Sequence, residues 1–409
     1  MSLHADTSTR AYPYAHSSRG LAAFLTRQAL SGLRAGSLRV TLPSGEIVER
    51  RGSEPGLDAE VALHTWRAVR RLASGGDVGF ARAFIDGDWS SPDLTAFIEL
   101  VARNGAAFCD PVKGSALFRA ANFAAHWLRA NTRAGARRNI EAHYDLGNDF
   151  YREWLDDSML YSSAIFADPS ISLEDAQRAR LARILELLDL SPGQSALEIG
   201  FGWGALARAM AGDKGARVEG VTLSPSQLAF SRDRIAAAGL SDRVDFRLED
   251  YRDTRGQFDR IASIEMIEAV GEKYWPSYFG ALHDRLKPGG VAVLQAITIA
   301  EDRFDAYRAR PDFIQRYVFP GGFLPTKSAI AQAAVRAGLR LQSSEHFGQS
   351  YAMTLAEWRK RFNEAWPRIE RQGFDASFRR LWTYYFSYCE AGFRAGVIDV
   401  GLYQLVRAD

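Results

Sequence analysis

Apolar and polar residues follow different spacings along this chain, and the spacings divide it into two parts. Residues 37–50 alternate around a turn at 43–46, which predicts a β-hairpin. Helical spacing is found in three nearby segments, 21–30, 58–74 and 94–103. We therefore expect a small α+β domain over residues 20–110, preceded by a flexible polar arm at 1–19.

From about residue 170, short apolar strands alternate with amphipathic helices. Helices are predicted at 172–190 and near 274–287. The strands are 195–199, 218–224, 244–251, 259–266 and 291–299. This alternation is typical of a parallel sheet covered on both faces, so we predict an α/β, Rossmann-like domain over 141–409. Its last segment, 355–409, is rich in aromatic residues, which usually form core but also suit a pocket for a long apolar ligand.

Composition narrows the class of function. The 409 residues are 47% hydrophobic and 24% charged with a net charge of +2, which excludes wholesale disorder and a polycation that binds nucleic acid. No apolar run approaches the ~18 residues that cross a bilayer, and residues 1–20 lack the apolar core of a secretory signal. Cys109 and Cys389 are far apart, so neither a disulfide framework nor a CxxC metal site is expected. These features predict a cytoplasmic protein without a metal.

Residues 111–140 carry positive charges and no Asp or Glu. The charges are Lys113, Arg119, Arg129, Arg133, Arg137 and Arg138, interleaved with Leu117, Phe118, Phe123, Trp127 and Leu128. A basic amphipathic linker of this kind either packs on a neighbouring domain or attaches to anionic lipid headgroups. Taken alone, the segment favours packing.

A glycine-rich turn follows the first strand of the second domain. The strand ends at Ile199, and Gly200, Gly202 and Gly204 come next. Glycines there let the backbone turn tightly and approach a ligand, as they do in dinucleotide sites. The spacing here is G-x-G-x-G rather than G-x-G-x-x-G, and Glu198 precedes the first glycine by two residues. A carboxylate at that point suits a cationic ligand, so the turn favours S-adenosylmethionine over NAD.

The next two strand ends also carry polar residues. Thr222 and Gln227 stand where many nucleotide sites hold the ribose with a carboxylate, and both can bond hydroxyls. Ser224 followed by Pro225 predicts a helix start at the same place, and the two interpretations are compatible. Asp250, after the third strand, is placed to accept a hydrogen bond from an adenine amino group.

Ten motifs resemble one family when they are taken in order. They are FARAFIDGDW (80–89), HYDLGNDFY (143–151), YSSAIF (161–166), LEIGFGWG (197–204), GVTLSPSQ (220–227), EDYRD (249–253), MIEAVG (266–271), FPGGFLP (319–325), HFGQSYAMTL (346–355) and TYYFSYCEAGFRA (383–395). Over essentially its whole length the chain is similar to the cyclopropane-fatty-acyl-phospholipid synthase family, to which the mycolic acid cyclopropane synthases belong. The resemblance implies a class I methyltransferase fold and S-adenosylmethionine as methyl donor.

The resemblance also implies a substrate and a place in the cell. The substrate is the double bond of an unsaturated acyl chain in a membrane phospholipid, and the N-terminal domain is similar to a lipid-binding module. The enzyme would then lie on the inner face of the membrane as a peripheral protein, which changes the interpretation of the basic linker; a homodimer is left open. The residues carried over to the cofactor are Tyr161, Ser162, Gly200, Gly202, Thr222, Gln227, Asp250 and Tyr251.

In the family, the proton formed in the reaction is thought to leave to a bound bicarbonate held by Cys, Glu, His and Tyr side chains and a backbone amide. By position, Glu268 and Tyr351 match two of these groups, and Ile297 supplies the backbone amide. Ser163 stands in place of the cysteine and Gln295 in place of the histidine. Both can bond an oxyanion, but glutamine cannot ionise. The resemblance therefore leaves open whether bicarbonate is bound, and whether the product is a cyclopropane or a methyl or methylene branch.

Cys389 also occupies a position where the family carries a cysteine. It is a candidate catalytic residue on that ground, although direct alkylation of an alkene requires no thiol, which favours a structural role. Two other functions compete with lipid methylation: a soluble N- or O-methyltransferase of a small molecule, and a non-enzymatic binding protein with a decayed site. The basic linker and N-terminal domain argue against the first, and the retained Glu268 and Tyr351 argue against the second.

Overall fold

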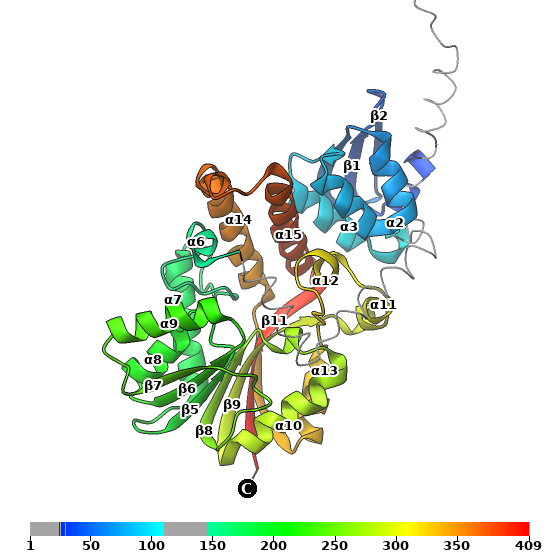
Figure 1. Cartoon of the computed structure of the whole chain (residues 1–409). Coiled ribbons are helices and arrows are strands. Elements are labelled where there is room, and N and C mark those ends of the chain that lie inside the picture. Colours follow the sequence, from blue (N-terminus) through cyan, green and yellow to red (C-terminus); the bar gives the residue numbers. More distant parts are fainter. Residues whose placement is uncertain (1–23, 25, 29, 110–145, 409) are drawn as a thin grey trace, which may run out of the picture.

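The computed structural model describes residues 24, 26–28, 30–109 and 146–408. The predicted polar arm and the basic linker at 111–140 lie outside the described residues. Within them, two sheets are present, one in each of the two parts that the sequence pattern separates (Figure 1).

The N-terminal part is a four-stranded sheet with two helices. Its elements are β1 (Ala35–Thr41), β2 (Ile47–Arg51), β3 (Glu54–Leu63), α2 (Trp66–Ile85), β4 (Trp89–Ser90) and α3 (Leu94–Cys109), after a 3-10 turn at Leu30–Gly32. The sheet order is β2-β1-β3-β4, and β1 pairs antiparallel with β2, so the predicted hairpin is confirmed. The helix predicted at 94–103 is also confirmed, as α3.

The helix predicted at 58–74 is wrong in its first half. Residues 54–63 form β3, which pairs in parallel with β1. Ala59, Val61 and Leu63 are buried at every second position, which is the period of a strand with one face on a core. Pairing with β1 decides the conformation, and the helix α2 begins only at Trp66.

The C-terminal part holds a seven-stranded sheet in the order β10-β11-β9-β8-β5-β6-β7. The strands are β5 (Ser195–Ile199), β6 (Arg217–Thr222), β7 (Val244–Leu248), β8 (Phe258–Ile264), β9 (Leu286–Ile299), β10 (Leu339–His346) and β11 (Ile398–Arg407). Strands β5 to β9 run parallel, and β11 is antiparallel to both neighbours. The mostly parallel sheet is therefore confirmed.

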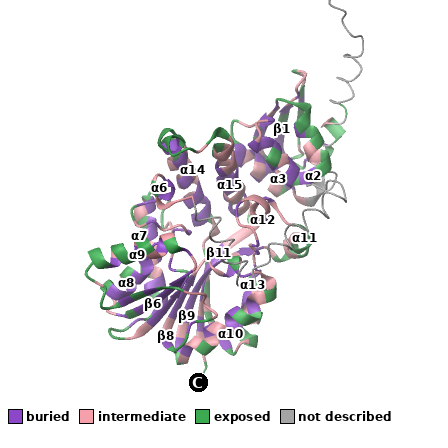
Figure 2. Ribbon diagram, viewed as in Figure 1, coloured by how far each residue is buried: buried purple, intermediate pink, exposed green. Residues whose placement is uncertain are grey.

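Helices cover this sheet and build a cap above its carboxyl ends (Figure 1). They are α6 (Asn148–Arg152), α7 (Leu173–Leu188), α8 (Ala205–Asp213), α9 (Pro225–Ala237), α10 (Trp275–Arg285), α11 (Phe304–Ala309), α12 (Phe313–Tyr317), α13 (Lys327–Arg336), α14 (Gly348–Arg371) and α15 (Ala376–Arg394), with 3-10 turns at Ile267–Ala269, Glu272–Tyr274 and Glu301–Arg303. Ser224 caps α9 by accepting from the Gln227 amide, with Pro225 in the first turn, as the sequence predicts. Figure 2 shows the strands of the sheet buried and the outer faces of the covering helices exposed.

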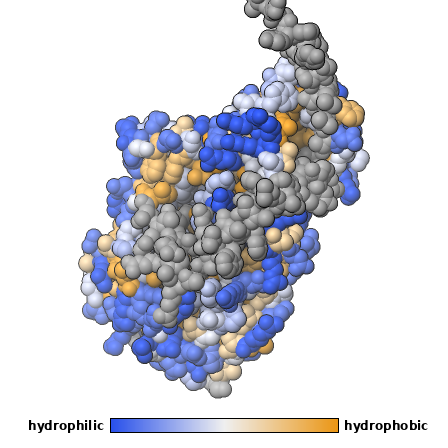
Figure 3. Space-filling view, turned by 45° about the vertical axis from the view of Figure 1, so that its right-hand side comes forward, coloured by the Kyte–Doolittle hydropathy of each residue, from blue (hydrophilic) through white to orange (hydrophobic). Residues whose placement is uncertain are grey.

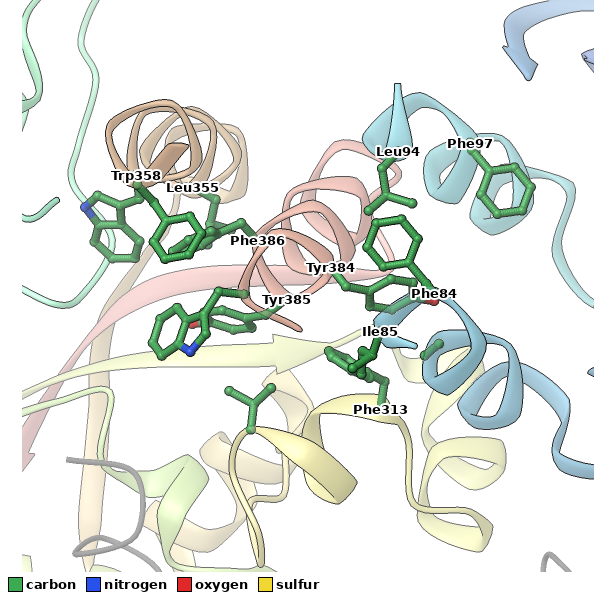
Figure 4. Packing of buried hydrophobic residues seen from close by; sticks show 14 of the residues in the cluster. Phe84, Ile85, Leu94, Phe97, Phe313, Leu355, Trp358, Tyr384, Tyr385 and Phe386 are labelled. Carbon is green, nitrogen blue, oxygen red and sulfur yellow. The ribbon is translucent and has the colours of Figure 1, made fainter. Parts of the chain in front are cut away.

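The aromatic helix α15 joins the two parts. Tyr384 lies 5.5 Å from Phe84 of α2 and 4.7 Å from Phe313 of α12, measured between ring centroids. Figure 4 shows it reaching toward these rings while Phe386 points to Trp358 and Leu355 of α14. The buried carboxylate of Glu390 accepts hydrogen bonds from Thr95 of α3 (3.3 Å) and Arg359 of α14 (3.0 Å). Apolar packing and a buried charge thus fix the N-terminal domain against the cap.

Among the described residues, no helix is both long enough and apolar enough to span a bilayer. The face drawn in Figure 3 is mostly hydrophilic, with smaller hydrophobic patches between the charged groups. Ordinary amounts of exposed apolar surface need no special explanation.

Candidate active site

One large cavity brings together most of the residues that the sequence analysis selected. Its volume is about 1240 Å³, above the ~300–1,000 Å³ of common ligand pockets. The selected residues that line it are Tyr161, Ser162, Glu198, Gly200, Gly202, Thr222, Gln227, Asp250, Tyr251, Glu268, Tyr351 and Cys389. Ser163 and Gln295 lie just behind this wall and are fully buried.

The glycine turn has the backbone form that the sequence predicts. Gly200 and Gly202 have φ of 80° and 55°, in the left-handed region that side chains disfavour. A Cβ built on Gly202 would meet nothing within 4 Å, although this glycine lies at the cavity wall. The turn thus leaves open space beside its backbone, as a bound cofactor requires. Gly204 differs, because its Cβ would meet Ser231 at 3.1 Å; it packs on α9 and does not line the cavity.

Three strand ends offer polar groups around this space. Glu198, at the end of β5, is buried, and its Oε2 has no hydrogen-bond partner. Burial raises the pKa of this carboxyl to about 8. Thr222 donates to Gln227 Oε1 over 3.2 Å, so the predicted ribose pair stands together. Asp250 is held by Arg252, whose Nε lies 2.8 Å from Oδ1. These groups fit a nucleoside with a cationic arm.

Tyr161 and Tyr251 complete the cofactor wall. The Tyr161 hydroxyl shares a 2.9 Å hydrogen bond with the hydroxyl of Tyr385. The Tyr251 ring packs edge-on against Tyr278 at 5.6 Å, and burial raises its pKa to about 12. Ser162 is buried, and its carbonyl accepts a hydrogen bond from Gln177 Nε2 at 3.0 Å. The loop that carries Tyr161 and Ser162 is therefore tied to α7.

Glu265, which the sequence analysis missed, contacts three of the five groups of the predicted anion cage. Its Oε1 accepts hydrogen bonds from the Ser163 backbone N–H (2.8 Å) and Gln295 Nε2 (2.7 Å), and its Oε2 accepts from the Tyr351 hydroxyl (2.7 Å). Groups expected to surround a bound anion thus surround a carboxylate of the chain itself. The backbone φ of Glu265 is 50°, which is unusual for a residue other than glycine. Such values are often found at functional positions.

Glu268 lies three residues further on and has a different environment. Its Oε1 accepts from the Ile297 backbone N–H at 2.5 Å, as the resemblance implies, and its Oε2 has no partner. Burial, together with the nearby Glu265 charge, raises the pKa of Glu268 to about 8. Burial also raises the pKa of Glu265, but three donors and the positive charge of Arg180 oppose that rise. Glu265 is the better equipped of the two to carry negative charge.

Ser163 and Gln295 both contact the carboxylate of Glu265, but through different groups. The Ser163 hydroxyl donates to the carbonyl of Ala164 at 2.9 Å, so the backbone amide and not the hydroxyl contacts the anion position. Gln295 does contact that position, but its partner is Glu265. The sequence did contain a signal: Glu265 is the first charged residue after an apolar strand, in the spacing E-x-x-E with Glu268.

Cys389 lies on α15 at the cavity wall. Burial raises the pKa of its thiol, and the charge of Asp312 acts in the same direction. A neutral thiol is a poor nucleophile, which agrees with a structural role.

Comparison with known proteins identifies the family. The sequence model described as mycolic acid cyclopropane synthetase matches residues 131–403. The chain belongs to this family. Tuberculostearic acid methyltransferase UfaA1 of Mycobacterium tuberculosis is 40% identical in an alignment 359 residues long, which covers 83% of this chain and 81% of that protein. The cyclopropane-fatty-acyl-phospholipid synthase of Escherichia coli K12 is 36% identical over 355 residues, 87% of this chain and 88% of that one.

A solved structure agrees. Mycolic acid cyclopropane synthase CmaA1, complexed with SAH and CTAB, matches with a TM-score of 0.62 and 28% identity over 66% of this chain and 98% of its own. The class I methyltransferase fold implied by the resemblance is confirmed. The protein is a methyltransferase of this family, and its cofactor is S-adenosylmethionine.

Proposed function

We propose that this enzyme methylates the double bond of an unsaturated acyl chain carried by a membrane phospholipid. Relatives named for a fatty-acid-derived product and for fatty-acyl phospholipids support a lipid chain as substrate. The product is a cyclopropane or a methyl- or methylene-branched chain. Mass spectrometry of lipids from a host that expresses the enzyme tests this: a gain of one CH₂ is expected, fragmentation distinguishes ring from branch, and unchanged lipids would contradict it.

The cavity supports a long apolar ligand because it extends beyond the cofactor wall into the N-terminal domain. Its far lobe is lined by strands β1 and β3 and by helices α2 and α3. Apolar lining residues there include Leu38, Val40, Val61, Leu63, Phe97 and Val101. The hydrocarbon part of an acyl chain has no hydrogen-bonding groups, so its burial against this apolar wall is driven by the hydrophobic effect alone. This lobe is the argument for assigning residues 20–110 as a lipid-binding-like domain.

The chemistry follows from the side chains beside the cavity. S-adenosylmethionine, when bound, supplies a methyl group on a positively charged sulfur. An alkene that has accepted a methyl group carries positive charge on the neighbouring carbon and must lose a proton. Glu265 can take that proton, because Ser163, Gln295 and Tyr351 hold its carboxylate in place. Aromatic walls such as Tyr161 can stabilise the positive charge and exclude water.

The single observation that carries the mechanism is the Glu265 carboxylate inside the cage. Glu265→Gln should lower kcat by roughly 10²–10⁴-fold, because the amide keeps the shape but loses the base. Cofactor affinity, measured by calorimetry, should stay close to that of the wild type. Glu272→Gln is the matched control, since this glutamate pairs with Arg308 and does not line the cavity. Turnover in Glu265→Gln equal to the control would refute the assignment.

Bicarbonate provides a second arm. Because Glu265 fills the cage, we expect the wild-type enzyme in degassed buffer to depend only weakly on added bicarbonate. Glu265→Ala opens space at the same donors, so bicarbonate should restore part of its activity. Strict dependence in the wild type, with no rescue in the variant, would mean that bicarbonate and not Glu265 is the base.

Membrane docking through residues 111–140 remains a proposal drawn from the sequence. Each positive charge near an anionic surface contributes about 1 kcal/mol, less at high salt. Sedimentation with phosphatidylglycerol vesicles should therefore weaken at high ionic strength. Reversal of Arg129, Arg133, Arg137 and Arg138 to glutamate should weaken it further, and unchanged binding would sink the docking idea.

A further inference from the structure

A fully buried arginine lies behind the cage. Arg180 of α7 is 1% exposed, and among the described residues it is the one arginine or lysine that is buried. Burying a guanidinium costs several kcal/mol unless opposite charges and hydrogen bonds compensate. Burial accordingly lowers the pKa of Arg180. The position of such a group needs an explanation that core packing does not supply.

Arg180 donates hydrogen bonds to two glutamines, one of which contacts Glu265. Arg180 Nε donates to Gln177 Oε1 at 3.1 Å, and Nη1 donates to Gln295 Oε1 at 3.5 Å. Nη2 has no hydrogen-bond partner, and Arg180 also lines the cavity. Both glutamines therefore present their oxygens to the arginine.

The orientation of the two amides follows from these contacts. A glutamine whose oxygen accepts from Arg180 must turn its nitrogen the other way. Gln295 then donates Nε2 to Glu265 at 2.7 Å. Gln177 likewise donates to the Ser162 carbonyl at 3.0 Å and so holds the loop that precedes Ser163. Through the two glutamines, one guanidinium thus positions both donors to Glu265 Oε1, which are Gln295 Nε2 and the Ser163 backbone N–H.

Arg180 is also the positive charge at this site. The titratable groups that face it come from four places: Glu265 after β8, Glu198 of β5, Tyr351 of α14 and Asp156 after α6. Glu265 in turn faces Tyr351 and the neighbouring Glu268. A positive charge within this group favours the ionised form of Glu265.

We propose that Arg180 is a positioning residue for methyl transfer, which turns the Gln295 amide toward Glu265 and supplies the positive charge that keeps that carboxylate ionised. The inference rests on the proposed role of Glu265 as the base. In this role Arg180 acts through Gln295 and through its charge.

The test is the pH profile of kcat, with methyl-labelled S-adenosylmethionine and vesicles of dioleoylphosphatidylglycerol. In Arg180→Gln the pKa of Glu265 should rise, because the opposing charge is gone. The acid limb of kcat should then move to higher pH by about one unit or more, and kcat at neutral pH should fall by about tenfold or more. Arg180→Lys should return the acid limb toward its wild-type position, because it restores the positive charge. Its kcat should stay lower, because an ammonium lacks the planar guanidinium that donates to both glutamines.

Arg178→Gln is the control, since Arg178 is an exposed arginine on the same helix; its profile should match wild type. Thermal melting measures whether each variant is folded. If Arg180→Gln fails to fold, Arg180→Lys serves as the test: its kcat should be lower than that of wild type, while the acid limb of its pH profile stays in place. An acid limb that stays in place in a folded Arg180→Gln would overturn the proposal while leaving Glu265 as base. If Glu265→Gln instead had the same turnover as wild type, Glu265 would not be the base, and the proposed role of Arg180 would be refuted with it.

Discussion

Glu265 and Glu268 are three residues apart, yet their surroundings prepare them for different tasks. Glu265 accepts three hydrogen bonds and lies near Arg180, so its negative charge is supported. Glu268 accepts one hydrogen bond and has an unpartnered oxygen. Two carboxyl groups whose environments differ in this way can divide basic and acidic roles between them. Burial and the nearby Glu265 charge favour the protonated form of Glu268, whose pKa is raised to about 8.

The raised pKa of Glu268 leads to a prediction about the pH dependence of stability. The pKa of Glu268 is raised from an ordinary 4.5 to about 8. Its contribution to the free energy of unfolding is therefore full below pH 4.5 and is lost as pH rises through 8. Glu268→Gln removes that dependence, which amounts to at most roughly 5 kcal/mol. Urea unfolding at pH 5.5 and 8.5 should show wild type losing more stability than the variant over this interval. Glu198, with a similar pKa, is present in both proteins and cancels in the comparison; parallel losses would contradict the prediction.

Cys389 gives a second prediction for a single residue. Because burial keeps its thiol neutral, Cys389→Ala should retain most of kcat and lose about 1 kcal/mol of stability. Cys389→Trp, by contrast, should block the cavity that the thiol lines. Radiolabelled methyl transfer measures both variants. Loss of turnover in a well-folded alanine variant would return the thiol to the list of catalytic groups.

At the level of elements, the turn between β5 and α8 determines where the cofactor lies. Gly200 and Gly202 both take left-handed φ values, and the space beside Gly202 is open. A side chain at Gly202 would be unfavourable for two reasons: it would strain the left-handed backbone, and it would occupy the volume that the cofactor needs. The second reason distinguishes this glycine from other left-handed ones.

Gly202→Ala should therefore weaken cofactor binding by more than about tenfold, in addition to a backbone cost of roughly 1–2 kcal/mol. Gly239→Ala is the control, because Gly239 also has positive φ (68°) and open space but is exposed and lies outside the cavity. Calorimetric titration with S-adenosylmethionine measures both. Equal affinity in the two variants would show that the cofactor does not approach this turn.

At the level of the whole molecule, the two domains share one cavity, and α15 joins them. Val101 of α3 lines the N-terminal lobe, so Val101→Phe should narrow it. If the lobe holds the far end of the acyl chain, the variant should lose about tenfold in kcat/KM for long chains and little for short ones. Val335→Phe is the control, since Val335 is exposed on α13 and outside the cavity. The same loss for all chain lengths would argue against the lobe as a chain site.

Local patterns predicted most of the secondary structure and the cofactor turn. The strand alternation that predicts the parallel sheet, the Ser224 cap and the glycines after β5 each depend on residues close together in sequence. The segment at 58–63 is one exception, because its pairing with β1 overrode a helical pattern. Strands β10 and β11 are another, because the sequence analysis predicted neither. The motifs also located Glu268 and Tyr351 at the cavity, although their roles stay predictions.

By itself, then, the sequence determined the family, the five parallel strands of the sheet and the cofactor, because periodicity and ordered motifs are local or additive properties of the chain. The tertiary structure alone decided which groups meet Glu265, since Ser163, Gln295 and Tyr351 come from distant segments. It also decided that Arg180 is buried among carboxylates, which no local pattern on α7 distinguishes from the exposed Arg178 beside it. Burial and charge compensation depend on the whole packed molecule, and for that reason they appear only in the fold.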